Sequence, residues 1–535
     1  MFSLQQANAL IIDDYQSMRT MLCDFVRTMG VSQIDTASNG KDAINHLNAN
    51  KYDIVICDFH LGPGANGQQV LEETKLRGLI GVSTIWIMVT AEKTPEMVMG
   101  TAEIKPDDYL LKPLNQALLQ SRLQRLLDRK QALGVVEAAI RAKDLAAAID
   151  HCDQLLKAQV ANPHEILRIK SDLLLTLGDY GAAKALFESV LALRNVPWAK
   201  TGLGKTLFFA RNYAGAVTLL EQVLVDNPMY MEAADWLAKT YEAMGDVAMV
   251  QQVLLQAAKL SPNSPLRQKN LGDAALKNGA LDLAQAAFEK NIRISEFSAH
   301  KSPSVYARLA EVLADKGESQ EALAVLKRSR ADFKSNPVAA LQAAAVESRI
   351  YQKMGHTEQA LSAMASAEQL LPQLGGNLST ELLMEVAKSH LKLGQEDKAS
   401  RIYAEVIKNN HEDVALSSQI AALFASEHLG DLGQALISAS RQEVIDINNQ
   451  GVMLAKQGDF QQGTKLLRSA VKQLPVSEVM LVNLCGLLIA QMNKEGYQPA
   501  LASEAKELLD RVHALNPANT KYYTYALVLT RLQRS

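Results

Sequence analysis

Two patterns of apolar residues follow each other along the chain. Up to about residue 125, short β-branched runs such as YDIVICD alternate with longer amphipathic stretches. From about residue 130 onward the strand-like runs stop, and Ala, Leu, Gln, Lys and Glu dominate to the end. The change predicts an α/β domain at residues 1–128, followed by an all-α region at residues 130–535.

In the first region, the alternation indicates βα units that form a parallel sheet, with strands buried on both faces. Five such units form an open, doubly wound sheet whose ligands bind outside the carboxyl ends of the strands. We expect strands near 9–14, 33–38, 52–58, 84–90 and 108–112, and helices near 16–29, 40–49, 67–77, 94–104 and 114–128.

Polar side chains stand at the ends of four of these strands. A single aspartate in such a place is usually a turn former, whereas suitable residues at four ends favour one shared site. Three carboxylates at one edge repel each other unless a cation intervenes, and oxygen ligands with open water positions suit Mg²⁺. A lysine and a threonine hydroxyl would complete the contacts of a phosphoryl group, so the set indicates phosphoryl transfer onto a carboxylate. The residues are Asp13 and Asp14 at the end of the first strand, Asp58 at the end of the third, Thr90 at the end of the fourth and Lys112 at the end of the fifth.

The motifs LIIDD, IVICD, MVTA and DDYLLKP make residues 5–128 resemble the receiver domains of two-component response regulators. The resemblance implies a flavodoxin-like fold with Asp58 as the phosphoacceptor. It further implies that Asp13, Asp14, Asp58 and the backbone carbonyl of His60 bind Mg²⁺.

The same resemblance assigns the residues around the phosphoryl group. Thr90 and Lys112 would bind its oxygens, with a cis peptide bond between Lys112 and Pro113. Tyr109 matches the aromatic residue that rotates inward on activation.

One loop departs from the common pattern of that family. After Asp58, where the family usually carries a Met-Pro pair, the run is FHLGPGANG. Its three glycines permit positive φ and a close backbone approach, so we interpret it as a remodelled loop beside an intact site. His60 and Glu92 each stand two residues after a site residue, where side chains would control the access of water and the phosphoryl lifetime.

Self-similar segments recur through the second region. Examples are LGDYGAAKALFESVL at 177–191, ARNYAGAVTLLEQVL at 210–224 and MGDVAMVQQVLLQAA at 244–258. Steps between the turns are 33 to 39 residues, a helix–turn–helix period that resembles the tetratricopeptide repeat (TPR). Small residues match the positions where that motif brings two helices together: Ala183, Ala216, Ala284, Ala322, Ala360 and Ala399.

We expect about ten TPR-type units, with an irregular region near 408–450. Stacked helix pairs bury each other's apolar faces and form a concave surface, which would bind a segment of a partner protein. A spacing or dimerising scaffold is the alternative. Lys205 and Lys239 fall on the groove face of successive first helices, either as contacts for an acidic segment or as solvated charges. The GKT at 204–206 lacks the upstream Gly and the strand of a nucleotide-binding loop, so we interpret it as part of a repeat.

Residues 114–140 join the two regions and contain no Pro and one Gly. Their leucines keep a helical stripe, which predicts a helix that runs nearly straight into the first repeat. Such a joint could transmit a change at Tyr109, unlike a Gly/Ser linker. The rival interpretation is that the stripe pairs with its copy in a receiver homodimer.

Composition excludes several classes of function. The net charge is −3, and no basic excess suggests a nucleic-acid partner. Four scattered cysteines favour a reducing compartment. The N-terminus lacks the pattern of a signal peptide and the longest apolar runs are too short to span a bilayer. We expect a cytoplasmic protein without membrane insertion.

The leading hypothesis is therefore a two-component response regulator. A sensor histidine kinase or phosphotransfer protein would phosphorylate Asp58, and the TPR array would bind an unknown protein partner as the output. We expect no enzyme activity beyond the receiver's own phosphorylation and dephosphorylation. The alternative is a constitutive TPR scaffold whose receiver is not used for phosphorylation. Direct transcription regulation is weakened by the absence of a basic stripe.

Overall fold

A computed structural model describes residues 7–91, 104–159, 163–374, 378–516 and 519–534 of the chain. Contacts between residues divide it into two compact units, Met1–Ser302 and Pro303–Ser535. The first unit contains the sheet and the first helical hairpins, and the second unit is helical throughout its described residues.

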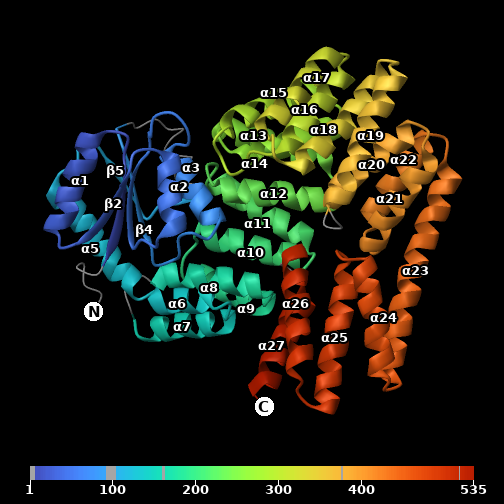
Figure 1. Ribbon diagram of the computed structural model, residues 1–535. Coiled ribbons are helices and arrows are strands. Elements are labelled where there is room, and N and C mark those ends of the chain that lie inside the picture. The colour runs from blue at the N-terminus through green and yellow to red at the C-terminus, as the bar shows by residue number, and fades with distance from the viewer. Residues whose placement is uncertain (1–6, 92–103, 160–162, 375–377, 517–518, 535) are drawn as a thin grey trace. The chain divides into compact units, whose positions relative to one another are not determined.

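The sheet has five parallel strands in the order β2-β1-β3-β4-β5. Helices cover both of its faces, with α1 and α5 on one side and α2 and α3 on the other (Figure 1). The predicted doubly wound fold is confirmed, and strand bounds agree within two residues at each end. The helix expected at 94–104 falls almost entirely outside the described residues. The strands are β1 (Asn8–Ile12), β2 (Gln33–Ala37), β3 (Ile54–Asp58), β4 (Ile85–Thr90) and β5 (Asp108–Leu111), and the helices are α1 (Gln16–Thr28), α2 (Gly40–Ala49), α3 (Gly67–Leu76) and α5 (Gln116–Gln131).

Register places the strand ends at one edge. Ile12 pairs with both Ala37 and Cys57, and Thr90 pairs with Leu111. The residues that follow β1, end β3 and β4, and follow β5 consequently meet at the carboxyl edge of the sheet, where open α/β sheets bind their ligands. Strands β3 and β4 are buried along their whole length, as expected for strands covered on both faces.

The remainder of the first unit is a series of helical hairpins. Several of their second helices begin at an Asp or Asn cap. Asp179, Asn212 and Asp246 each accept a hydrogen bond from the backbone N–H three residues later. The helices are α6 (Gly134–Arg141), α7 (Leu145–Lys157), α8 (Pro163–Leu177), α9 (Tyr180–Leu193), α10 (Pro197–Phe209), α11 (Tyr213–Asp226), α12 (Met231–Met244), α13 (Val247–Leu260), α14 (Pro265–Lys277) and α15 (Leu281–Ile294).

The second unit continues with helical hairpins of the same kind. Across both units, the six small residues expected at close helix contacts are completely buried. The helices are α16 (Pro303–Asp315), α17 (Ser319–Asp332), α18 (Pro337–Lys353), α19 (Thr357–Leu374), α20 (Thr380–Lys392), α21 (Glu396–Asn409), α22 (Val414–Ser426), α23 (Gly430–Lys456), α24 (Phe460–Gln473), α25 (Glu478–Glu495), α26 (Pro499–Leu515) and α27 (Thr520–Arg534).

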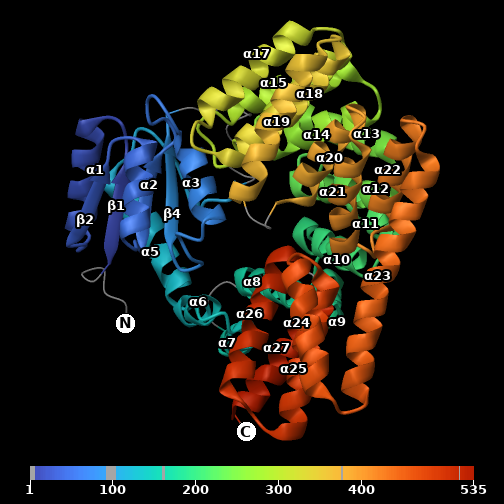
Figure 2. The same cartoon turned by 45° about the vertical axis from the view of Figure 1, so that its right-hand side comes forward.

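The irregular period near 408–450 has a structural cause. Helix α23 is 27 residues long and packs against α22 at one end and α24 at the other (Figure 2). Gly433 lies against Phe424 of α22, and Gly451 lies against Leu467 of α24. One continuous helix therefore serves two hairpins, and the turn that would separate them is missing.

The joint between the regions differs from the sequence expectation. The helix that leaves the sheet ends at Gln131, and a new helix starts at Gly134. The backbone N–H of Leu133 donates to the carbonyl oxygen of Lys130 at 2.9 Å. This hydrogen bond spans three residues instead of the four of an α-helix, and it marks the break between the two helices. The prediction of a nearly straight helix across this joint is therefore wrong.

Among the described residues, no helix is both long enough and apolar enough to cross a bilayer.

Candidate functional site

Asp58 ends β3 at the centre of the carboxyl edge, with 5% of its surface exposed. Its Oδ1 accepts a hydrogen bond of 2.9 Å from the backbone N–H of Phe59. Its Oδ2 lies 2.9 Å from Nζ of Lys112, which comes directly after β5. Burial raises the pKa of Asp58, and the hydrogen bond from Lys112 opposes that rise. A backbone N–H thus donates to one carboxylate oxygen, and the ammonium of Lys112 donates to the other.

Lys112 joins two of the carboxylates. Besides Asp58, its Nζ donates to Oδ2 of Asp13 at 3.0 Å. Burial alone would lower the pKa of Lys112, but the hydrogen bonds to Asp58 and Asp13 outweigh that effect and raise it. The ammonium is therefore charged at neutral pH and available to a phosphoryl oxygen. The peptide bond to Pro113 is cis, as the resemblance implied.

Three carboxylates form a candidate metal site. Oxygen atoms of Asp13, Asp14 and Asp58 all lie within 4.8 Å of one another. Oδ1 of Asp14 is shielded from solvent and has no hydrogen-bond partner among the described residues. A buried carboxylate oxygen without a partner is costly, and a cation would satisfy it. The oxygen set fits Mg²⁺, which prefers carboxylates and keeps several water ligands.

Two further predicted residues lie on the strands beside Asp58. Thr90 ends β4 and is completely buried, and its backbone carbonyl accepts the N–H of Lys112 at 2.8 Å. Tyr109 on β5 is half-buried against the cluster that contains Trp86 and Met88. The structure thus brings Thr90 to the site edge and Tyr109 to a neighbouring position on the next strand.

The glycine-rich loop has the geometry that its composition predicted. Gly62 and Gly64 have φ of 69° and 111°, in the region that favours glycine. At Gly67, an added Cβ would lie 2.1 Å from the backbone oxygen of Asp58. The first residue of α3, directly after its cap Asn66, therefore lies close to the backbone of the site residue.

Of the two residues proposed to control the access of water, one lies among the described residues. His60 is exposed at the rim, its ring edge-on to Phe59 with centroids 5.1 Å apart. Glu92 lies outside the described residues.

Comparisons with known proteins agree with this geometry. Residues 9–124 match the family described as Response regulator receiver domain. They are a receiver domain. Chemotaxis protein CheY-3 of Vibrio cholerae is 27% identical over 120 residues, which cover 22% of this chain and 91% of that protein. Chemotaxis protein CheY of Pseudomonas aeruginosa is 24% identical over 120 residues, covering 22% and 95%. Chemotaxis response regulator CheY4 of Vibrio cholerae, a solved structure, is 26% identical and covers 23% of this chain and 98% of its own, with a TM-score of 0.21. The family assignment of this part supports a role in two-component signalling.

The receiver contacts the first hairpins through residues that sequence reasoning missed. Nζ of Lys130 in α5 lies 2.8 Å from Oδ1 of Asp107 and 3.9 Å from Oε1 of Glu165 in α8. Nζ of Lys105 lies 3.0 Å from Oε2 of Glu232 in α12. Such pairs join residues far apart in sequence, and charge alone does not single them out among the 113 Lys, Arg, Asp and Glu residues of the chain.

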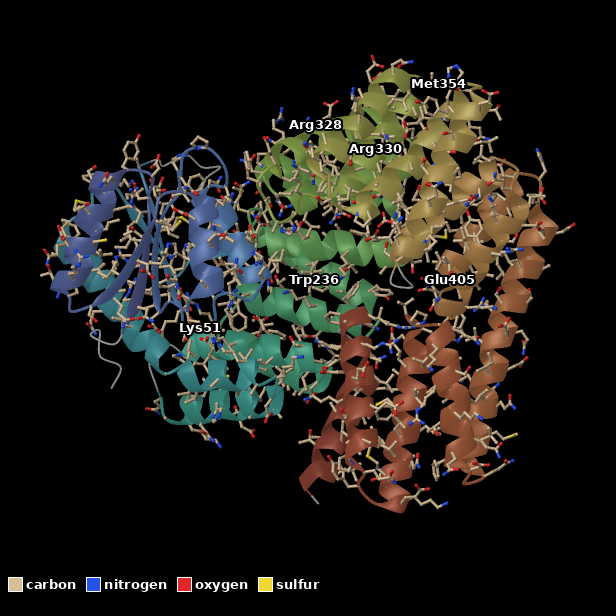
Figure 3. All side chains as sticks on the ribbon, viewed as in Figure 1. Lys51, Trp236, Arg328, Arg330, Met354 and Glu405 are labelled. Carbon is tan, nitrogen blue, oxygen red and sulfur yellow. The ribbon has the colours of Figure 1, made fainter. Side chains whose placement is uncertain are left out.

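The two lysines predicted to lie on the groove face, Lys205 and Lys239, contact other side chains of the chain. Nζ of Lys205 on α10 lies 2.5 Å from Oε1 of Glu232. Nζ of Lys239 on α12 lies 4.6 Å from the ring centroid of Trp236, a residue marked in Figure 3, and 5.5 Å from that of Phe208. Burial opposes the ionisation of Glu232, but Lys205 and Lys105 lower its pKa to about 2. Lys205 is therefore paired with a carboxylate, whereas Lys239 lies over aromatic rings.

Proposed function

We propose that the protein is a two-component response regulator that receives a phosphoryl group on Asp58 and acts through protein binding by its helical repeats. One observation carries the first half: Asp13, Asp14, Asp58, Thr90 and Lys112, from four strand ends, meet at one edge of the sheet. The donor is a phosphohistidine of a sensor histidine kinase or of a phosphotransfer protein.

The residues define the chemistry of the transfer. A carboxylate oxygen of Asp58 attacks phosphorus, the bond between phosphorus and the donor imidazole breaks, and the imidazole leaves with its electron pair and takes up a proton. Lys112 offsets charge on a phosphoryl oxygen, and the Thr90 hydroxyl donates to another. Asp13, Asp14 and Asp58, with the His60 carbonyl, would hold Mg²⁺, which neutralises charge on the phosphoryl oxygens when bound.

The product changes the charge at the end of β3. A phosphoryl group carries about −1.5 to −2 charges at neutral pH, against −1 for the carboxylate. Lys112 then has a stronger acceptor than Asp13, and Lys112 directly follows β5, the strand that carries Tyr109. We propose that this strand is the element through which phosphorylation changes the receiver. Exposed His60, and Glu92, would set how long the phosphoryl group survives.

The repeats are of the tetratricopeptide type, and a register shared by distant hairpins supports this. A small residue on the first helix packs against a large residue sixteen positions later on the second. An added Cβ at Gly204, Gly272 or Gly451 would lie within 3.0 Å of Leu220, Phe288 or Leu467, respectively. The same spacing recurs in the pairs α10–α11, α14–α15 and α23–α24, so these hairpins are copies of one unit.

Protein binding is the output that such hairpins favour, because stacked units expose first helices as a continuous surface. Aromatic side chains line part of it in the first unit, where Phe208 and Phe209 contact Trp236 with ring centroids 5.5 and 5.6 Å apart. We propose no enzyme activity beyond the receiver's own phosphoryl chemistry, and a cytoplasmic location. Self-association through the receiver is a second form that this output can take.

The experiment compares partner capture with and without a phosphoryl mimic. The tagged full chain is incubated with cell extract in Mg²⁺, with or without beryllofluoride, and retained proteins are identified by mass spectrometry. A response regulator retains a partner in one state and loses it in the other, and Asp58→Ala removes the difference. Identical capture in both states would favour the constitutive scaffold.

A further inference from the structure

A cavity lies at the opposite end of the receiver from Asp58. It is bounded by the loop before β4, by the starts of β4 and β5, and by α5, α6 and α8, and its volume is about 450 Å³. This volume lies in the range of sites that hold small organic molecules. Its apolar wall comes from both the receiver and the first hairpins: Ile80, Val82, Trp86, Ile140 and Ile169.

One polar group at this cavity lacks a partner. The indole of Trp86 is 99% buried, and its Nε1 has no hydrogen-bond partner among the described residues. An indole nitrogen can donate and cannot accept, and leaving it without a partner inside the protein is unfavourable. The missing partner is therefore a hydrogen-bond acceptor.

Three of the four cations of the wall have a carboxylate within ion-pair distance. Lys130 lies beside Asp107 and Glu165, Arg141 pairs with Glu137, and Lys105 pairs with Glu232 outside the wall. Lys75 instead donates to the backbone oxygens of Ile104 and Lys105, at 2.5 and 2.8 Å.

Among the described residues, no carboxylate lies within ion-pair distance of Lys75. Burial lowers the pKa of Lys75 to about 8. An anion bound beside the Lys75 ammonium would favour its charged form and offset this lowering of the pKa.

We propose that this cavity binds a small, largely apolar organic anion, whose acceptor atom takes the Trp86 indole N–H and whose charge lies beside Lys75. Its body lies against the isoleucines of α6 and α8. Such a ligand contacts the receiver and the first hairpins at once, and it strengthens their packing.

The probe is 8-anilinonaphthalene-1-sulfonate, an apolar aromatic molecule with one sulfonate. It is titrated into the full chain carrying Trp198→Phe and Trp236→Phe, so that Trp86 is the one remaining tryptophan of three. We expect a single saturable site whose occupation quenches Trp86 emission and raises the unfolding temperature. Unchanged Trp86 emission at saturation would overturn the proposal.

Two variants of that chain locate the site. Ile140→Phe fills the cavity and weakens binding about tenfold or more, whereas Val135→Phe, on the exposed side of the same helix, leaves it unchanged. Lys75→Met weakens the sulfonate about tenfold but leaves the neutral analogue N-phenyl-1-naphthylamine unaffected. Equal binding by Ile140→Phe and Val135→Phe would overturn the location, and full sulfonate affinity in Lys75→Met would overturn the charge assignment. Circular dichroism shows whether each variant is folded. If Ile140→Phe does not fold, Ile140→Val replaces it; this change enlarges the cavity, and we expect it to alter the affinity.

Discussion

Nζ of Lys112 lies 2.9 Å from Oδ2 of Asp58, although 54 residues separate them in the sequence. The parallel register of β3, β4 and β5 makes this contact, because it brings the ends of the third and fifth strands to one edge. Burial raises the pKa of Asp58, and the ion pair with Lys112 offsets part of that rise. The ionised form of the proposed phosphoacceptor is therefore favoured by a residue that follows another strand.

Lys112→Ala should slow phosphorylation of Asp58 by a small acyl phosphate at least about tenfold, because the cation no longer offsets phosphoryl charge. The pKa of Asp58 should also rise further, since burial and Asp13 raise it and Lys112 opposes them. The pH at which the rate is half-maximal should consequently move upward, as measured by phosphorylation rates across pH. An unchanged rate and pH profile would contradict the role of Lys112.

Gly67→Ala should disturb the site directly, because the new Cβ would lie 2.1 Å from the Asp58 backbone oxygen. Such crowding costs about 1–3 kcal/mol of unfolding free energy, and urea denaturation measures it. The matched control is Gly134→Ala, whose new Cβ meets no atom within 4 Å. We expect the control to stay within about 0.5 kcal/mol of the original chain; equal effects of the two changes would contradict the close approach.

A buried ion network in the second unit should carry a large share of its stability. Arg349, on α18, is bonded to Glu311 and lies 2.6 Å from Oε2 of Glu385. Burial opposes ionisation of Glu311, but Arg349 and Arg308 lower its pKa to about 2. Arg349→Met leaves two buried carboxylates without their main partner and should cost about 3–5 kcal/mol in urea denaturation.

Its control is Arg330→Met, which breaks the more exposed pair of Arg330 with Glu347. That change should cost about 1 kcal/mol or less. Similar losses in the two variants would mean that Arg349 has no special role.

The packing of α3 against the segment that follows α15 should weaken as pH rises. Nε2 of His300 lies 3.1 Å from Oε1 of Glu72 on α3, and this hydrogen bond raises the pKa of His300 against the opposing effect of burial. A raised pKa in the folded state means that the stabilisation is complete below the ordinary histidine value of 6.5 and is lost as pH rises through the raised value.

Hydrogen exchange of α3 should therefore become faster, after correction for the intrinsic rate, between about pH 6 and about pH 8. His300→Gln should remove this pH dependence, and Glu72→Gln should do the same. A pH dependence that persists in both variants would contradict the contribution of this pair.

The site could be predicted from the sequence because strand ends are a local property. Asp13, Asp58, Thr90 and Lys112 each end or follow an apolar run, and parallel strands bring such ends together whatever the loops between them do. The close approach of Gly67 was likewise readable from the composition of its loop. The orphan oxygen of Asp14 was not, because hydrogen-bond partners depend on tertiary packing.

The helical part was predictable in type and less so in its interruptions. The break at Ala132–Leu133 lies in a stretch with a continuous leucine stripe, and tertiary packing of α6 against α7 overrides that pattern. Helix α23 explains the irregular region that the sequence did predict. No Gly or Pro interrupts residues 434–450, and one helix continues through them. The contact of Lys105 with Glu232 depends on how two domains pack, which no local pattern encodes.

The central claim is that Asp58 accepts a phosphoryl group in a site that requires Mg²⁺. Intact-mass spectrometry of the full chain after incubation with acetyl phosphate and Mg²⁺ tests it most directly. We predict one added phosphoryl group, mapped to Asp58, that is absent in Asp58→Asn and after removal of Mg²⁺ with a chelator. No adduct on the original chain, or an equal adduct on Asp58→Asn, would contradict the account.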